Sequence, residues 1–317
     1  MFEKIKELFN NTQDAQKNKE EASEEQQSIN IENKISQEMI EKASEKLKEI
    51  TQKEVVKIKV VGLNEDLTLT QSKFGGLPYL PQDKEVPVDE NNIQLLHLAQ
   101  INCAELPENN IYPQNGILQF WIGRDDIYGM DFDSGTNNNG FRVIYYSEID
   151  ESITKEQVAN KYIYPNFKEK EEYSIFEPEN ATFELKFEKI TEHICYSDYN
   201  FESKFKEIFN EFYPENKIAD DKELYEVLDN ENYNKLLEIF TNIGHKIGGY
   251  PFFTQWDPRG NDKYSAYNIL LLQIDSDFVR GSWEIIWGDS GVGNFFITEE
   301  QLAALDFSKI LFNWDCY

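Results

Sequence analysis

Side chains that could take part in recognition are concentrated between residues 255 and 259. Gln255, Asp257 and Arg259 accompany Trp256 in this short stretch. A guanidinium can hold a carboxylate through two parallel hydrogen bonds, and a tryptophan can supply much of the buried area of an interface. We therefore predict a recognition loop here. The sequence leaves an alternative equally open, in which Asp257 and Arg259 flank Pro258 and tie the loop to its own protein.

A serine between glycines is the nearest approach to a catalytic motif. Asp289 and Ser290 lie in the segment WGDSG, residues 287–291. A nucleophilic serine needs a base within hydrogen-bond reach, and only His245 of the three histidines could serve. A turn capped by Asp289 is the simpler interpretation. We assign no catalytic residue, and the sequence favours a non-enzymatic protein without deciding the question.

Metal-binding spacing is absent from the histidines and cysteines. His193 with Cys195, and His97 with Cys103, come closest, but neither pair has the short repeated spacing of a zinc site. The loop 131–135 and the asparagine-rich run 137–140 offer oxygen ligands, yet the glutamate of a calcium loop is missing. We interpret this region as a solvated hairpin connection and predict no metal and no cofactor.

The charge balance limits the classes of partner. The 317 residues include 59 acidic and 31 basic ones, for a net charge of −28. Such a chain repels nucleic acid and anionic membranes, so a basic protein such as a toxin domain is the better-matched partner. The simpler explanation is that the acidic surface only keeps the protein soluble and monomeric. Three widely spaced cysteines indicate a reducing compartment, so we expect a cytoplasmic protein, and no apolar run is long enough to span a bilayer.

Hydrophobic periodicity predicts the elements that must position these residues. Residues 1–30 read as a polar tail, and 31–50 as an amphipathic helix with i,i+4 charge pairs. Alternating or continuous apolar runs predict strands at 55–70, 95–101, 116–122, 141–146 and 182–190. Helical spacing predicts helices at 151–160, 201–212 and 222–240. The class is therefore α+β and rich in β structure.

One unit occurs twice in the chain. KFGGLPYL at 73–80 can be laid on KIGGYPFF at 246–253, and the same offset of 173 brings Gln100 onto Gln273 and Asn102 onto Asp275. We predict two related halves, about 55–150 and 246–317, with an α-rich insert at 151–245. Each half is too small to bury enough apolar area alone, so they should pack about a pseudo-twofold axis as one domain, 31–317.

The polar residues that close the matching strands have separate expected roles. Gln100 and Gln273 should be buried amides with fixed partners, because an unpaired buried amide costs about 1–3 kcal/mol. Asn102 and Asp275 follow at the strand ends and are predicted to face the cleft between the halves. The glycine pairs read as turns with φ above zero, because neither pair opens a helix after a strand as a phosphate cradle does.

At these motifs the sequence resembles the YwqG-like family, a bacterial family named as a domain of unknown function. The resemblance runs over about 55–317 and rests on KFGGLPYLP (73–81), LAQIN (98–102), GILQFW (116–121), HKIGGYPFFTQWDPR (245–259), LLLQID (270–275), WGDSGVGNFFI (287–297) and NWDCY (313–317). It implies an α+β protein with an internal duplication and no established reaction. The family is also associated with the immunity side of bacterial toxin systems.

Two functions remain open from the sequence. The first is a non-enzymatic cytoplasmic binding protein that engages a basic partner through its acidic surface and polar loops. An immunity-type protein is one form that this function could take. The second is an enzyme or a small-ligand sensor with a site between the halves near Asn102, Asp275 and Arg259. A deep pocket with converging polar groups would favour the second function, and a shallow acidic face would favour the first. A monomer is expected, rather than an obligate oligomer.

Overall fold

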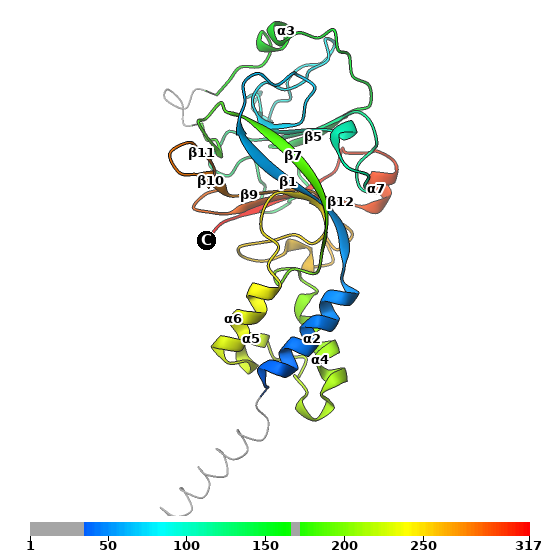
Figure 1. The fold of residues 1–317 in the computed structure, drawn as a ribbon. Coiled ribbons are helices and arrows are strands. Elements are labelled where there is room, and N and C mark those ends of the chain that lie inside the picture. The colour runs from blue at the N-terminus through cyan, green and yellow to red at the C-terminus, as the bar shows by residue number, and fades with distance from the viewer. Residues whose placement is uncertain (1–34, 166–171) are drawn as a thin grey trace, which may run out of the picture. The chain divides into compact units, whose positions relative to one another are not determined.

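A computed structural model describes residues 35–165 and 172–317 of the chain, shown in Figure 1. The predicted tail, 1–30, and the first residues of the predicted helix 31–50 lie outside these ranges. The chain divides into two compact units, Met1–Lys46 with Glu202–Leu236, and Leu47–Phe201 with Leu237–Tyr317. The first is helical where it is described, and the second contains the strands, so each is treated by itself.

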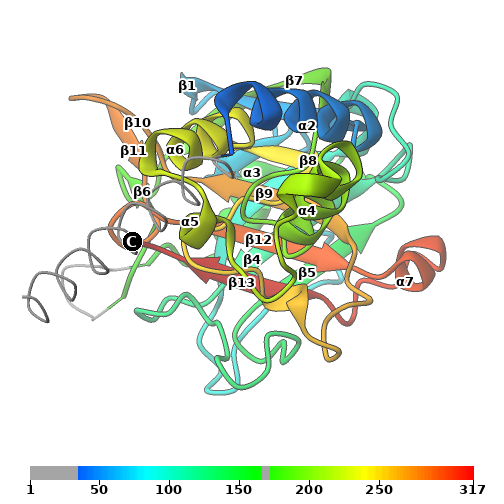
Figure 2. The ribbon, with the colours of Figure 1, turned by 90° about the horizontal axis from the view of Figure 1, so that it is seen from below.

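A ten-stranded antiparallel sheet dominates the second unit. Its strand order is β13-β12-β9-β8-β1-β7-β2-β3-β4-β5. The strands are β1 (Lys53–Leu63), β2 (Lys73–Gly75), β3 (Leu96–Asn102), β4 (Ile117–Ile122), β5 (Arg142–Tyr146), β7 (Thr182–Glu192), β8 (Lys246–Gly248), β9 (Ile269–Asp275), β12 (Val292–Ile297) and β13 (Leu311–Asp315). The predicted α+β class is confirmed in this coarse sense. Figure 2 shows β9, β12 and β13 side by side.

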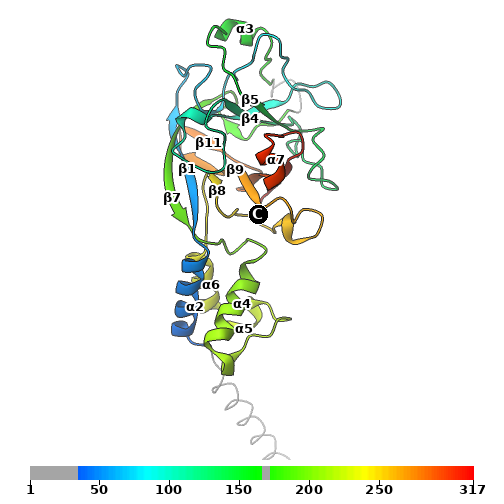
Figure 3. The same ribbon diagram turned by 90° about the vertical axis from the view of Figure 1, so that its right-hand side faces the viewer.

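Two long strands form the centre of this sheet. β1 and β7 pair antiparallel from Lys53↔Glu192 to Leu63↔Phe183, and Figure 3 shows them side by side. β2, β3, β4 and β5 follow on the β7 side, and β8, β9, β12 and β13 follow on the β1 side in the same sequential order. β8 and β9, which lie 173 residues after β2 and β3, therefore take matching places on the other side of the central pair.

The apolar core lies where the curled sheet brings β4 towards β12 and β13. The ring centroids of Phe120 and Phe295 are 5.1 Å apart, and those of Phe295 and Phe312 are 4.5 Å apart. Phe141, just before β5, lies 5.2 Å from Phe312. All four rings are buried, so aromatic packing joins the two outer portions of the sheet.

Smaller elements complete the second unit. A three-stranded sheet has the order β10-β11-β6 and consists of β10 (Asp277–Val279), β11 (Trp283–Ile285) and β6 (Phe176–Glu177). The helices are α3 (Lys155–Ala159) and α7 (Glu299–Ala303), with 3-10 turns at Cys103–Glu105 and Pro258–Gly260. A capping box between Thr154 and Gln157 begins α3, which explains why this helix is shorter than the predicted 151–160.

The remaining helices are α2 (Gln37–Ile50), α4 (Phe201–Phe212), α5 (Leu224–Val227) and α6 (Asn230–Ile239), with a 3-10 turn at Pro214–Asn216. The prediction of one helix over 222–240 is wrong. Leu228 has an extended backbone, with ψ of 145°, and the carboxylate of Asp229 accepts a hydrogen bond from the N–H of Asn232 at 3.0 Å. The side chain therefore caps a new helix at this position. No helix in the described part of the chain is long and apolar enough to cross a membrane.

Candidate functional site

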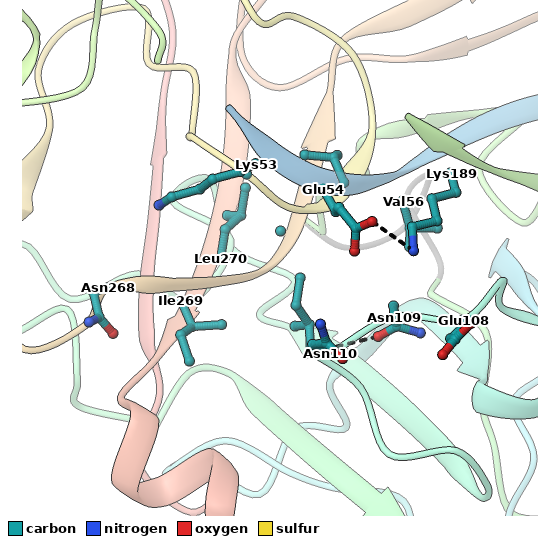
Figure 4. A pocket seen from close by; sticks show the side chains of 14 residues that line it. Lys53, Glu54, Val56, Glu108, Asn109, Asn110, Lys189, Asn268, Ile269 and Leu270 are labelled. Carbon is teal, nitrogen blue, oxygen red and sulfur yellow. Dashed lines mark hydrogen bonds and ion pairs between the residues drawn. The ribbon is translucent and has the colours of Figure 1, made fainter. Parts of the chain in front are cut away.

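A cavity of about 310 Å³ opens between β1, the start of β9 and the loop 108–111. Figure 4 shows Glu54 and Lys189 on one side, Ile269 and Asn268 on another, and Asn109 and Asn110 below. The lining residues are Lys53, Glu54, Val55, Val56, Glu108, Asn109, Asn110, Ile111, Lys189, Gly248, Gly249, Asn268, Ile269 and Leu270. The volume lies at the lower end of the range, about 300–1,000 Å³, that is usual for ligand pockets.

The cavity exists because β8 is short. This strand pairs with β1 only from Lys57↔Lys246 to Val55↔Gly248, and with β9 only at Lys246↔Gln273. Gly248 and Gly249 then have φ of 80° and 74°, which turns the chain out of the sheet. Beyond Gly248, the space between β1 and β9 is therefore no longer filled by a strand.

The polar groups of the cavity are balanced in charge. Nζ of Lys189 lies 2.9 Å from a carboxylate oxygen of Glu54, and Nζ of Lys53 lies 4.1 Å from the ring centroid of Tyr250. Glu108 is exposed at the rim. Two lysines and two glutamates thus surround an apolar floor, in a chain whose net charge is −28.

The loop 108–111 is held rigidly where it covers the cavity. Oδ1 of Asn109 accepts hydrogen bonds from the backbone N–H groups of Ile111 and Tyr112, at 3.0 and 2.8 Å. The hydroxyl of Tyr112 donates to the backbone carbonyl of Leu271 at 3.0 Å, which fastens the loop to β9. A Cβ on Gly248 would lie 2.1 Å from Cδ1 of Ile111, whose side chain would have to shift, and the φ of 80° at this position also favours glycine.

The corresponding place on the β7 side of the sheet is filled by the protein. Nδ1 of His97 lies 3.0 and 3.1 Å from the carbonyl oxygens of Gly75 and Gly76, and it donates to them. The backbone N–H of His97 donates to the hydroxyl of Tyr162 at 3.2 Å. Burial, with the charge of Lys73 nearby, lowers the pKa of His97 to about 3. At the same offset of 173 the chain has Leu270, which has no nitrogen in its side chain to donate.

The matching glutamines have matching partners, as their burial requires. Both are fully buried. Gln100 accepts from Tyr79 N at 2.7 Å and also from Nε2 of Gln119 at 2.9 Å, and it donates to the carbonyls of Leu69 and Gln71 at 2.6 and 2.9 Å. Gln273 accepts from Phe252 N at 2.7 Å and donates to the carbonyls of Asn242 and Gly244 at 3.2 and 2.8 Å. Every partner of the second amide is 173 residues after its counterpart, and the prediction of buried amides with fixed partners is confirmed.

The predicted recognition arginine is engaged within the chain. Arg259 is 5% exposed, and its guanidinium donates to Asp257 and, at 2.9 Å, to Asp198. The rings of Phe296 and Tyr199 lie 4.7 and 5.4 Å from its Cζ. Burial lowers the pKa of Arg259, but the two carboxylates outweigh it and raise the pKa overall. The fork predicted for a partner's carboxylate therefore holds carboxylates of this protein.

The other residues of the predicted loop differ from Arg259 in exposure. Trp256 is 71% exposed. The amide of Gln255 donates to the carbonyl of Cys316 at 2.8 Å, and its backbone N–H donates to Asp315 at 3.3 Å. The loop is thus bound to the C-terminal strand, with Trp256 left on the surface. Recognition through Trp256 stays a prediction.

Asn102 and Asp275 end their strands but do not line the cavity. Oδ1 of Asn102 accepts from Ala104 N at 3.1 Å, and its amide donates to the carbonyl of Thr70 at 3.0 Å. Asp275 accepts from the backbone N–H of Gly244 at 2.6 Å. Burial raises the pKa of Asp275, while this hydrogen bond opposes the shift. Both side chains therefore fix loops of their own protein.

Within the described part of the chain, no hydrogen bond joins His245 to Ser290. Nδ1 of His245 accepts from the backbone N–H of Asp275 at 3.1 Å, so the ring proton is on Nε2, which lies 3.4 Å from Asp277. Ser290 has φ of 122° in a turn, and its N–H donates to Trp287 O at 3.1 Å. This geometry matches the turn interpretation of residues 287–291.

Lys73 is a buried cation without a carboxylate hydrogen-bond partner among the described residues. It is 2% exposed, and its ammonium donates to three backbone carbonyls, those of Thr68, Leu69 and Leu77. Burial, with a smaller contribution from Lys155, lowers its pKa to about 7. The lysine 173 residues later, Lys246, is paired with Glu192 at 2.8 Å.

An acidic hollow of about 380 Å³ forms around the predicted hairpin connection. Asp89, Asp125 and Asp131 each accept hydrogen bonds from nearby backbone N–H groups. A hydrogen bond from Asn137, then those from the backbone, lowers the pKa of Asp131. Phe132 is 75% exposed beside it. No group of three metal-ligating side chains that could hold an ion occurs within 35–165 and 172–317.

Sequence reasoning assigned none of the cavity-lining residues to a site. The signal was present at one position: at the offset of 173, His97 is aligned with Leu270, while the next residues, Leu98 and Leu271, agree. The sequence predicted a turn at Gly248 and Gly249. It could not show that this turn interrupts the sheet, because that depends on where the neighbouring strands β1 and β9 lie.

The chain was compared with known protein families and with curated proteins. Residues 72–316 match a family described as Domain of unknown function (DUF1963). No curated protein was found to match the chain. The family match begins just before β2 and leaves out β1, so it contains the glycine pair and the loop 108–111 but not Lys53 or Glu54. The chain therefore belongs to the DUF1963 family, which is named as a domain of unknown function.

Proposed function

We propose that this chain is a non-enzymatic binding protein and that its binding site is the cavity beside Gly248 and Gly249. One observation carries the proposal. At matching places in the sheet, the ring of His97 fills the space beside Gly75, whereas on the other side a cavity remains between β1 and β9 beyond Gly248 and Ile111. A pocket with an apolar floor and a few polar groups at its rim has the composition of a binding site.

The proposal includes an internal duplication. The order of the outer strands on each side of β1 and β7, and the equivalent hydrogen bonds of Gln100 and Gln273, support two halves of common origin, as the resemblance to the YwqG-like family implies. When two halves have diverged, the place where they differ is where one of them has acquired a separate role. We also propose that the protein acts in the cytoplasm, in keeping with its three free cysteines.

A screen of small fluorinated fragments by ¹⁹F NMR tests the site. Asn110→Trp places a large side chain at the exposed rim of the cavity. Asn115→Trp makes the same change at an exposed position five residues later, which does not line the cavity. We expect some fragments to bind the wild type and Asn115→Trp equally and to lose binding in Asn110→Trp. Fragments that bind all three proteins alike, or no binding at all, would refute this location.

The acidic hollow supports a second candidate function, recognition of a basic protein segment, as in the predicted immunity-type role. Asp89, Glu90, Asp125, Asp131 and Asp133 line it, and Phe132 offers an exposed ring to a cationic side chain. Hydrogen bonds from Asn137 and from the backbone lower the pKa of Asp131, which favours its charged form.

Peptide binding measured at different salt concentrations tests this second function. Binding of a fluorescent Arg-Lys-rich peptide is measured by anisotropy at low and at physiological ionic strength, with wild type and with the variant Asp125→Asn, Asp133→Asn. We expect weaker binding at higher salt and in the variant, because exposed charges are screened over about 8–10 Å. Equal binding by the variant would place the charge attraction elsewhere on the acidic surface.

A further inference from the structure

We infer that the occupant of the cavity is an extended peptide segment of a partner, which adds as a short strand between β1 and β9. This inference rests on the proposed function and names the ligand of the same site. The cavity lies in the plane of a sheet, at the place that β8 would fill if it continued past Gly248. Where β8 lies between them, β1 and β9 are two strand spacings of about 4.8 Å apart, so the end of β8 leaves room for one strand.

The main chain of β1 presents its hydrogen-bonding groups to this space. Ile58 N donates to His245 O at 2.9 Å, across the boundary between β1 and β8. Main-chain groups of an antiparallel strand alternate between its two neighbours, so Val56 and Glu54 face the same side as Ile58. β8 reaches only as far as the pair Val55↔Gly248, so the main chain of Glu54 faces the cavity.

The main chain of β9 presents a second edge. Lys246 pairs with Gln273, so by the same alternation Leu271 turns its main-chain groups towards the space that β8 leaves. A β-bulge at Leu271, between the pairs Leu272↔Phe295 and Leu270↔Phe296, then shifts the alternation by one residue, so that Leu270 also faces this space. The carbonyl of Leu271 is already bound by the hydroxyl of Tyr112 at 3.0 Å. The next such position, Leu270, lines the cavity. An inserted strand of about three residues would therefore lie between Glu54 and Leu270.

The β7 side of the sheet shows how such a space is satisfied. There the backbone N–H of His97 is bound by the hydroxyl of Tyr162, and the carbonyls of Gly75 and Gly76 are bound by the ring of His97. The occupants supply hydrogen bonds to main-chain groups as well as apolar contact. A peptide supplies both along its length, because each residue carries one donor and one acceptor.

The charge of the rim selects for a peptide of low net charge. Glu54 is paired with Lys189 at 2.9 Å, and Lys53 and Glu108 are the other two charged lining residues. The four formal charges cancel, whereas the chain as a whole carries −28. Binding here should therefore depend little on salt, in contrast to binding at the acidic hollow.

Peptide titrations followed by ¹H–¹⁵N NMR of the full chain test the inference. The probe is acetyl-Val-Thr-Val-Thr-Val-amide, and its control is the same peptide methylated at alternate backbone nitrogens. We expect amide shifts at Glu54, Leu270 and Gly249 with the first peptide and at least about a tenfold weaker affinity with the methylated one, because it cannot donate to the strands. Asn110→Trp should lose binding, and Asn115→Trp should keep it.

The outcomes separate the inference from the proposed function. Equal affinity for both peptides would overturn strand addition, because side-chain contacts alone would then explain binding. Fragments that bind at the cavity without any binding of either peptide would also overturn the peptide inference but leave the proposed function standing. If neither fragments nor peptides bind, both proposals fail.

Discussion

The strongest prediction concerns Arg259 and its neighbour Trp256, which the sequence grouped in one loop. Arg259→Ala would remove the only cation in contact with the buried carboxylates of Asp198 and Asp257 among the described residues. Breaking a buried ion pair by deleting one partner costs about 3–5 kcal/mol, because a charge remains buried without compensation. The lost packing against the ring of Phe296 adds to this.

Urea unfolding followed by tryptophan fluorescence measures the effect. We expect Arg259→Ala to lower the unfolding free energy by about 3–5 kcal/mol at an unchanged m value. Trp256→Ala removes a side chain that is 71% exposed, so its effect should stay within about 0.5 kcal/mol. If Arg259→Ala unfolds the protein outright, Arg259→Lys keeps one positive charge and should recover part of the stability.

Adding Asp198→Asn and Asp257→Asn to Arg259→Ala provides a check on the cause. If uncompensated charge is the cost, the triple variant is more stable than Arg259→Ala alone. The reasoning is refuted if Arg259→Ala loses less than about 1 kcal/mol, or if Trp256→Ala proves the more damaging change. Either result would return Arg259 to the recognition role that its sequence context suggests.

Two further predictions concern buried polar groups. Gln100→Leu and Gln273→Leu should each cost about 1–3 kcal/mol per buried partner left unpaired, and Gln100→Leu should cost more because Oε1 of Gln100 also accepts from Nε2 of Gln119 at 2.9 Å; an equal or smaller loss for Gln100→Leu in urea unfolding would contradict this. Lys73 has a folded pKa of about 7 against an ordinary 10.5, so above pH 7 the unfolded chain binds the extra proton and stability rises with pH. Relative to Lys73→Met, the wild type should gain about 2–3 kcal/mol of unfolding free energy from pH 7 to 9, and a flat difference would refute this.

Local patterns in the sequence were sufficient for most of the secondary structure. β3, β4, β5 and β7 were predicted to within two residues at each end, and α4 was predicted with its observed ends. The reason is physical, since burial of one face imposes a period of two on strands and near 3.6 on helices. The prediction of one helix over 222–240 was wrong because the apolar spacing continues across Asp229, whose side chain caps a new helix.

The sequence also aligned the two glutamines and the two glycine pairs, because a repeated backbone geometry needs the same residue types at the same spacing. It could not decide between recognition and structural duty for Arg259, since the deciding partner, Asp198, lies 61 residues away. Nor could it locate the cavity, which depends on β8 ending between two strands that continue. Tertiary structure alone decided these points. A gap in a sheet is formed by strands that are distant in the sequence, so no local sequence pattern marks it.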